Sequence, residues 1–327
     1  MKVFVTGGAG YIGSVCVQAL LRAGHDVLVF DNLSEGHRQA VLDAPLVTGD
    51  LRDHSLLDRT LREYAPDAVM HFAASALVAE SVENPRKYYE NNIESSLSLL
   101  RTMLACGVRR IVFSSTAATY GVPEIVPIPE DHPQQPINPY GFTKLVIEHA
   151  IRDYARAYGL GGVILRYFNA AGASHDGRLG EHHHHETHLI PIVLQVALGQ
   201  REHVKIYGTD YPTEDGTCVR DFIHVEDLAE AHVRALDYCR DGHVLAANVG
   251  TGQGHSVRQV IETARAVTGH PIPAVEAPRR PGDPPVLVAA VERARRELGW
   301  TATCSDLRSI IQSAWQWHRA HPHGYEN

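Results

Sequence analysis

The residues best suited to chemistry are Tyr140 and Lys144, four positions apart in the stretch Tyr-Gly-Phe-Thr-Lys. Residues with this separation share one face of a helix. A phenol has a pKa of about 10 and is a weak base at neutral pH, but a neighbouring ammonium stabilises the phenolate and lowers that pKa. The spacing therefore indicates a tyrosine that removes a proton from an alcohol. Taken alone, it is equally typical of a pair on a helix surface.

A hydroxyl-rich strand end precedes this pair in the sequence. Ser114, Ser115 and Thr116 close an apolar run that begins near residue 110. A hydroxyl at the end of that strand is well placed to hydrogen-bond the same substrate oxygen as the tyrosine. We therefore expect Thr116, Tyr140 and Lys144 to be the catalytic residues.

The first residues of the chain predict how a cofactor is held. An apolar run at 3–5 is typical of a buried strand, and Gly7, Gly10 and Gly13 follow it before an expected helix at 14–22. Glycines leave backbone N–H groups and a helix N-terminus open to a pyrophosphate. Asp31 ends the next strand, where a carboxylate accepts hydrogen bonds from an adenosine ribose and repels a 2′-phosphate. This combination favours NAD binding over an ordinary glycine-rich turn.

The elements around these motifs alternate between strand and helix as far as residue 168. This rhythm predicts an α/β fold: a Rossmann-type doubly wound parallel sheet with a smaller mixed α/β C-terminal substrate domain. We expect an NAD-binding domain at 1–169, with 221–249 returning to it. The substrate domain is then expected to comprise 170–220 and 250–327.

Composition excludes several classes of protein. The chain has 327 residues, 44% of them hydrophobic, and a net charge of −8. Without a basic block, nucleic acid is not an expected partner. Without a run of about 18 apolar residues, no membrane span is expected. The N-terminus has the pattern of a strand and not of a signal peptide. Five scattered cysteines without metal-binding spacing favour free thiols in the cytoplasm.

Short motifs at 6–13, 31–32, 49–51, 71–74, 113–115, 139–141, 166–169, 211–225 and 277–283 carry a family resemblance. Together they resemble the UDP-glucose 4-epimerase (UDP-galactose 4-epimerase) family, within the extended short-chain dehydrogenase/reductases. The resemblance covers essentially the whole chain, and 211–225 is close to diagnostic. It implies reversible NAD-dependent C4 epimerisation of UDP-galactose and UDP-glucose through a 4-keto intermediate, with the second domain binding the UDP-sugar.

The resemblance also implies which residues contact each ligand. The expected cofactor contacts are Gly7, Gly10, Tyr11, Ile12, Gly13, Asp31, Asn32, Asp50, Leu51, Phe72, Ala73, Asn91, Ser114, Tyr140, Lys144 and Phe168. The expected substrate contacts are Thr116, Tyr140, Asn169, His188, Leu189, Tyr207, Arg220, Arg280, Asp283 and Leu287. Two arginines suit a diphosphate because guanidinium forms bidentate, charge-assisted bonds. Taken alone, each arginine is more typical of a solvated surface.

The sequence departs from the family pattern at several places, one of them Ala76, where some relatives carry a lysine that would contact the cofactor. Thr116 stands where many members have serine, and it keeps the hydroxyl. Leu287 stands where a large aromatic narrows the sugar pocket and a small residue admits N-acetylated sugars, so we expect a preference for UDP-galactose. The segment 181–188 is unusually rich in histidine. It is consistent with a metal site or with a solvated loop; we favour the loop and expect no metal.

Other activities remain as alternatives. A nucleotide-sugar 4,6-dehydratase needs further acid/base groups, which relatives place as an Asp-Glu pair where Ala117 and Ala118 stand here. Another extended short-chain dehydrogenase acting on a UDP-sugar is a further alternative, as is a plain alcohol dehydrogenase. A catalytically silent NAD-binding regulator usually loses the tyrosine or the lysine.

The resemblance further implies a homodimer built from two helices, expected at about 85–106 and 140–158. The first carries Ile93, Leu97, Leu100 and Leu104 at helical spacing. This stripe is consistent with a partner subunit or with packing on the sheet alone.

Overall fold

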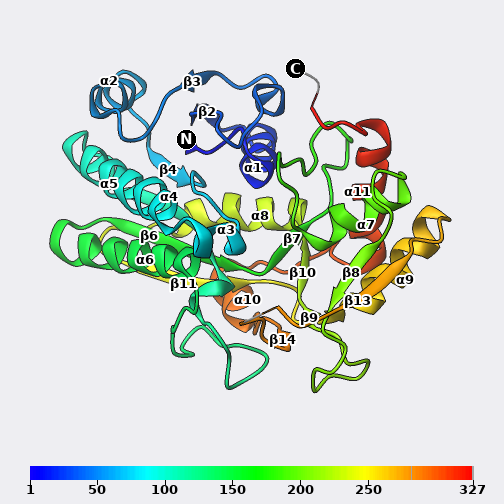
Figure 1. Cartoon of the computed structure of the whole chain (residues 1–327). Coiled ribbons are helices and arrows are strands. Elements are labelled where there is room, and N and C mark those ends of the chain that lie inside the picture. Colours follow the sequence, from blue (N-terminus) through cyan, green and yellow to red (C-terminus); the bar gives the residue numbers. More distant parts are fainter. Residues whose placement is uncertain (281, 326–327) are drawn as a thin grey trace.

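The computed structural model describes residues 1–280 and 282–325. Its centre is a seven-stranded parallel sheet in the order β11-β6-β5-β4-β1-β2-β3 (Figure 1). The strands are β1 (Lys2–Thr6), β2 (Asp26–Asp31), β3 (Leu46–Thr48), β4 (Ala68–His71), β5 (Arg110–Thr116), β6 (Gly161–Tyr167) and β11 (Val244–Val249). The predicted doubly wound α/β class is confirmed. Residue 281 of the motif at 277–283, and residues 326–327 of the predicted second domain, lie outside the described residues.

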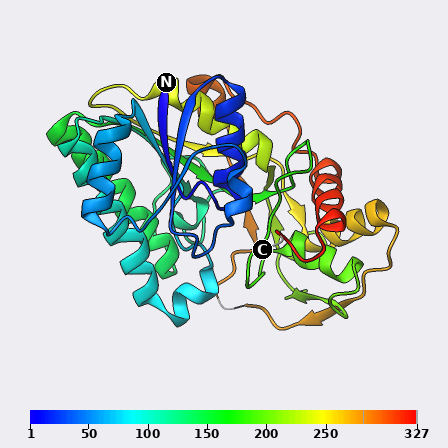
Figure 2. The same ribbon diagram turned by 90° about the horizontal axis from the view of Figure 1, so that it is seen from above.

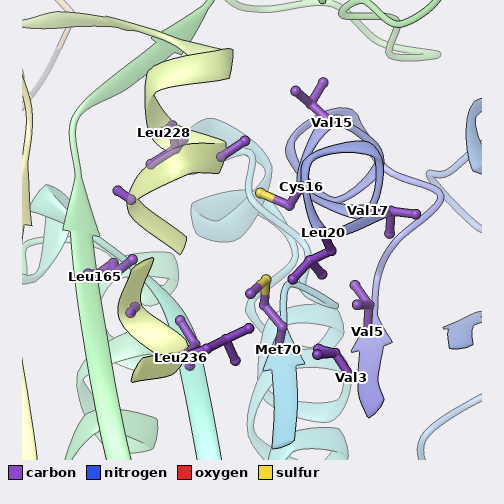
Figure 3. Close-up of a cluster of buried hydrophobic side chains, with 14 of the residues drawn as sticks. Val3, Val5, Val15, Cys16, Val17, Leu20, Met70, Leu165, Leu228 and Leu236 are labelled. Atoms are coloured by element: carbon purple, nitrogen blue, oxygen red, sulfur yellow. The ribbon is translucent and has the colours of Figure 1, made fainter. Parts of the chain in front are cut away.

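Helices cover both faces of this sheet, because successive strand residues point to opposite sides. Val3 and Val5 pack with α1 (Tyr11–Arg22) and α8 (Val225–Ala235) in one core (Figure 3). Phe4 packs with α2 (His54–Tyr64), α5 (Ser95–Ala105) and α6 (Pro139–Tyr158) in the other. The remaining short elements of this part are α3 (Val78–Glu83), α4 (Pro85–Tyr88), α10 (Glu292–Leu298), the π-helical turn η2 (Tyr89–Glu94) and the 3-10 turns η1 (Arg38–Val41), η3 (Ala117–Thr119) and η4 (Leu236–Tyr238).

A second group of elements builds a separate core beside the large sheet. Figure 2 shows its helices on the side away from α5 and α6. They are α7 (Leu189–Ala197), α9 (Val257–Thr268) and α11 (Leu307–Ala320), which enclose buried apolar residues such as Val193 and Ile310. Three small sheets accompany them: β7 (Asn169–Ala171) with β10 (Phe222–His224); β9 (Val219–Arg220) with β12 (His255–Ser256) and β14 (Val286–Leu287); and β8 (Val204–Tyr207) with β13 (Ala274–Ala277).

Two elements differ from expectation. The helix expected at 85–106 is divided into α4, η2 and α5. The widened turn η2 carries the buried Asn92, whose amide donates to Ser75 O and to Thr143 Oγ1 of α6, both at 3.0 Å. Within the segment 221–249, expected to return to the large sheet, β10 pairs instead with β7, whereas β11 joins the large sheet beside β6. The division into two domains stays a prediction.

None of the helices in the described part of the chain combines the length and apolar character needed to cross a bilayer. All five cysteines are free thiols.

Candidate active site

The loop between β1 and α1 is a tight backbone cradle. Gly7 has a φ of 74°, and a Cβ there would lie 2.4 Å from the backbone nitrogen of Ala73. A Cβ on Gly13 would lie 2.1 Å from the carbonyl oxygen of Gly7. No side chain caps α1, which begins after Gly10. The first N–H groups of α1 therefore face a loop without side-chain cover, which fits a pyrophosphate.

Asp31 lies against this cradle at the end of β2. Its carboxylate accepts hydrogen bonds from the Ala9 N–H at 2.9 Å and from the Leu33 N–H at 2.8 Å. Burial raises its pKa, and these two backbone donors act in the opposite direction. A hollow at the C-terminal ends of the strands collects many predicted cofactor residues: Gly7, Gly10, Asp31, Asn32, Asp50, Leu51, Phe72, Ala73 and Asn91.

Three further predicted cofactor contacts directly follow Gly10, which lines this hollow. Tyr11, Ile12 and Gly13 form the first turn of α1. Asp50, within the hollow, is held by Arg52, whose guanidinium donates to both carboxylate oxygens at 2.8 Å. That pairing lowers the pKa of Asp50 to about 2, so its carboxylate is charged at neutral pH.

Thr116, Tyr140 and Lys144 come together where β5 ends and α6 begins. The Thr116 hydroxyl lies beside the Tyr140 phenol, and Lys144 Nζ donates to the Ser114 carbonyl at 2.8 Å. Burial raises the pKa of Tyr140 to about 12, while the bond from Thr116 acts to lower it. Burial lowers the pKa of Lys144 to about 7, against the opposing charge of Glu148.

The position of α6 depends on a buried ion pair that sequence reasoning missed. Glu148, two turns beyond Tyr140, accepts from Arg166 of β6 at 2.9 and 2.6 Å and from Ser115 of β5 at 2.6 Å. The glutamate thereby joins the helix that carries Tyr140 to the two strands beneath it. Two signals were available: Glu148 repeats the helical spacing of Tyr140 and Lys144, and Arg166 begins a motif of the family resemblance.

Several predicted substrate residues meet in the second group of elements. Arg220 of β9 pairs in register with Leu287 of β14, and its Nη2 lies 3.8 Å from Asp283 Oδ1. The guanidinium of Arg280 lies 4.0 Å from the centroid of the Tyr207 ring. These contacts place two guanidinium groups on neighbouring short strands and loops.

Asp221, which sequence reasoning also missed, ties these strands together. Its buried carboxylate accepts from the Thr251 and Gly252 N–H groups at 2.9 and 3.0 Å and from the Ala289 N–H at 3.2 Å. Its own N–H donates to Leu287 O at 3.0 Å. The sequence offered one signal for Asp221, which is its position directly after Arg220 in the motif at 211–225.

Leu287 and Phe168 link this region to the catalytic strand end. Both pack on a small apolar cluster that includes Ala117, the residue after Thr116. Asn169 begins β7 directly after Phe168, and its N–H donates to Asp221 O at 3.0 Å. His188 and Leu189 begin α7, and the His188 ring is directed toward Glu181 and Glu186 instead of the arginines.

Comparisons with known proteins agree with this site. Residues 3–250 match the model of the NAD dependent epimerase/dehydratase family. The chain is 55% identical over 326 residues to the UDP-glucose 4-epimerase of Halalkalibacterium halodurans, covering 99% of this chain and 98% of that protein.

Two solved structures are similarly close. One is UDP-glucose 4-epimerase from Brucella ovis in complex with NAD, with a TM-score of 0.93, 49% identity and coverage of 96% and 97% of the two chains. The other is the enzyme from Bifidobacterium longum with NAD⁺ and UDP, with a TM-score of 0.95, 40% identity and coverage of 99% and 100%.

Proposed function

The chain belongs to the NAD dependent epimerase/dehydratase family, and from that premise we propose that it interconverts UDP-galactose and UDP-glucose by reversible C4 epimerisation through a 4-keto intermediate. The observation that carries the proposal is that Thr116, Tyr140 and Lys144 meet where β5 ends and α6 begins. This constellation shares the C-terminal edge of the sheet with the glycine cradle and Asp31.

The cradle fits NAD because the tight backbone packing at Gly7 and Gly13 leaves no room for a Cβ, and the N-terminus of α1 has no side-chain cap. Asp31 would hold the adenosine ribose, and the hollow lined by Asp50, Leu51 and Phe72 would hold the adenine end. Lys144 and Ser114 would lie at the nicotinamide end. NAD held there would supply hydride transfer from and back to the C4 carbon of the sugar.

Proton movement falls to Tyr140. Its phenolate accepts the proton of the sugar O4, and the same phenol returns it when the 4-keto group is reduced. Thr116 hydrogen-bonds the phenol and favours the phenolate, as its effect on the tyrosine pKa indicates. The Lys144 ammonium adds positive charge in a buried site where such charge acts strongly. General-base catalysis of this kind typically contributes about 10²–10⁴-fold in rate.

The UDP part would be held away from the reacting carbon. Arg220 and Arg280 supply bidentate donors for the diphosphate, and Asp221 fixes the strands that carry Arg220 and Leu287. Binding energy from this remote handle retains the intermediate while the hexose turns over between the two steps. In this proposal residues 1–169 and 221–249 bind NAD, and residues 170–220 and 250–327 bind the UDP-sugar.

The 4,6-dehydratase alternative is not favoured. Ala117 and Ala118 follow Thr116 in η3 and offer no acid/base group for eliminating water. The matched relatives quoted above are epimerases by name.

We further propose a cytoplasmic homodimer. Tyr89 of η2 and Phe142 of α6 are exposed, and their ring centroids lie 6.3 Å apart on the surface of these two neighbouring helices. Of the expected stripe, Leu100 is buried in the core, while Ile93, Leu97 and Leu104 are half-buried. The free thiols support the cytoplasmic location. Light scattering that finds a monomer at micromolar concentration would exclude the dimer.

Product analysis tests the reaction. Purified protein is incubated with UDP-galactose without added nucleotide, and the sugar products are followed by NMR. We expect UDP-glucose at equilibrium and no net release of reduced nicotinamide. A 4-keto-6-deoxy product would instead identify the dehydratase, and a protein that leaves UDP-galactose unchanged would exclude the proposal.

A further inference from the structure

The histidine-rich segment 181–188 is not the solvated loop that its sequence favours. The side chains of Glu181 and Glu186 are only 5% and 4% exposed. Two of the histidines, His183 and His188, turn inward to meet them, whereas His184 and His185 remain exposed. The segment ends at the start of α7, so its conformation determines how that helix begins.

Four potential ligand atoms converge in this segment. His188 Nδ1 lies 2.9 Å from Glu181 Oε1 and 2.9 Å from Glu186 Oε1. His183 Nδ1 lies 3.1 Å from Glu186 Oε2 and 3.6 Å from Glu181 Oε1. Each imidazole nitrogen thus faces two carboxylate oxygens, although an Nδ1–H has one hydrogen and directs it well at only one acceptor. With one ligand atom taken from each of the four residues, these atoms lie within 4.8 Å of one another.

We propose that Glu181, His183, Glu186 and His188 form a binding site for one divalent transition-metal ion, with zinc as the favoured ion. Zinc binds imidazole nitrogen and carboxylate oxygen at about 2.0–2.2 Å, and a tetrahedron of that size separates its ligand atoms by roughly 3.3–3.5 Å. The imidazole nitrogens lie 2.9–3.6 Å from carboxylate oxygens, close to that range, and one ligand atom from each residue lies within 4.8 Å of the other three.

Charge and ligand type favour the same ion. Two carboxylates and two neutral imidazoles carry two negative charges, which a divalent cation balances in a buried place where uncompensated charge is costly. Calcium and magnesium prefer shells of oxygen only, whereas imidazole suits zinc and its transition-metal neighbours. Because the protein supplies all four ligands, the site has no open position for a substrate. It is therefore structural and not catalytic.

The bound ion would fix the entry to α7. Glu186 already accepts from the Thr187 and His188 N–H groups at 2.8 and 2.7 Å, which closes the turn just before the helix. A metal that joins Glu186 to Glu181 and His183 would cross-link this turn to the segment that precedes it. An ion that binds only the folded chain raises its stability by mass action.

Direct metal binding provides the test. Protein stripped with a chelator is titrated with Zn²⁺ against a chromogenic chelator of known affinity, and bound zinc is counted by mass spectrometry after gel filtration. We expect about one ion per chain and a rise in melting temperature. Glu181→Gln and His183→Ala should each weaken zinc binding by more than ~10²-fold, since loss of an outer partner alone costs about 10–100-fold.

His185→Ala is the matched control, because His185 belongs to the same run but is exposed and lies outside the cluster. It should keep the wild-type stoichiometry and affinity. If wild-type protein binds no zinc above background, or if His185→Ala loses as much affinity as His183→Ala, the proposal is wrong. The nearly isosteric Glu181→Gln decides the matter if His183→Ala does not fold. Both readouts are independent of turnover, so they stand apart from the proposed reaction.

Discussion

Glu148 and Arg166 form a bidentate ion pair inside the protein, with only 0% and 2% of their side chains exposed. The pair joins α6, which carries Tyr140 and Lys144, to β6, and the Ser115 hydroxyl joins the same glutamate to β5. This buried carboxylate and the Lys144–Ser114 hydrogen bond therefore both fix the catalytic helix against the strand that ends in Thr116.

Replacing Glu148 by glutamine should destabilise the protein by about 3–5 kcal/mol, because the buried charge of Arg166 would lose its counter-charge. Urea unfolding measures this change. Asp153→Asn on the same helix is the control, because Asp153 is exposed and pairs only with Arg156 at 3.7 Å. It should cost less than ~1 kcal/mol. Equal effects of the two substitutions would mean that the buried pair does not hold the helix.

The Thr116 hydroxyl should matter more for rate than for stability. Thr116→Val keeps the side-chain shape but removes the hydrogen bond to Tyr140, so kcat should fall by about 10²–10³-fold. Because that bond lowers the pKa of Tyr140, the tyrosine limb of the pH–rate profile should move to higher pH in the variant. Thr116→Ser should retain near-wild-type activity. A valine variant with an unchanged pH profile would argue against this coupling.

Acid should destabilise the fold through buried histidines. Burial lowers the pKa of His232 to about 4, against the opposing hydrogen bond to Leu228, whereas an unfolded histidine titrates at about 6.5. Between these values the unfolded chain binds a proton that the folded chain does not. Stability therefore falls as pH drops below about 6.5, by up to about 1.4 kcal/mol per pH unit for this residue.

His232→Leu should reduce that pH slope in urea unfolding measured from pH 7 to 5. His243→Leu is the control, because His243 is exposed and meets solvent in both states. The account of His232 would be wrong if both substitutions left the slope equal to that of the wild type.

Leu287 should favour UDP-galactose over its N-acetylated counterpart. It is half-buried, lies in register with Arg220 and packs on the same small apolar cluster as Phe168. An acetamido group buried there without a partner would cost roughly 1–3 kcal/mol, or about 10–100-fold in kcat/KM. Leu287→Ser should narrow the difference between the two sugars. Val286→Ser, on the other face of the same strand, should not. Equal kcat/KM values for both sugars in the wild type would show that Leu287 does not control selectivity.

Local sequence patterns predicted many residues of the candidate site, because these residues belong to short motifs. The glycine loop, Asp31 and the Tyr140–Lys144 spacing each lie within one strand–helix unit. By contrast, the pairing of Arg220 with Leu287 and the role of Asp221 depend on contacts across tens of residues, which periodicity does not encode. The contact between Thr116 and Tyr140, and the separate contact of Lys144 with Ser114, likewise needed the structure.

The conformation of the histidine-rich segment could not be predicted from the sequence either. Composition favoured a solvated loop, since four consecutive histidines at 182–185 carry no periodic signal. Only the folded chain separates the inward His183 from the exposed His184 and His185. The sequence did not predict the widened turn η2 either, because its π-helical geometry depends on the buried contacts of Asn92.

The most direct test of the central claim follows the hydrogen at C4. UDP-galactose labelled with deuterium at C4 is incubated with the protein in ordinary water, and the UDP-glucose formed is analysed by NMR. We predict that the deuterium is retained at C4, and that Tyr140→Phe, which keeps its fold, forms no labelled UDP-glucose. Loss of the label to solvent during conversion would contradict the account, because the C4–hydrogen bond would then be rebuilt with a solvent proton.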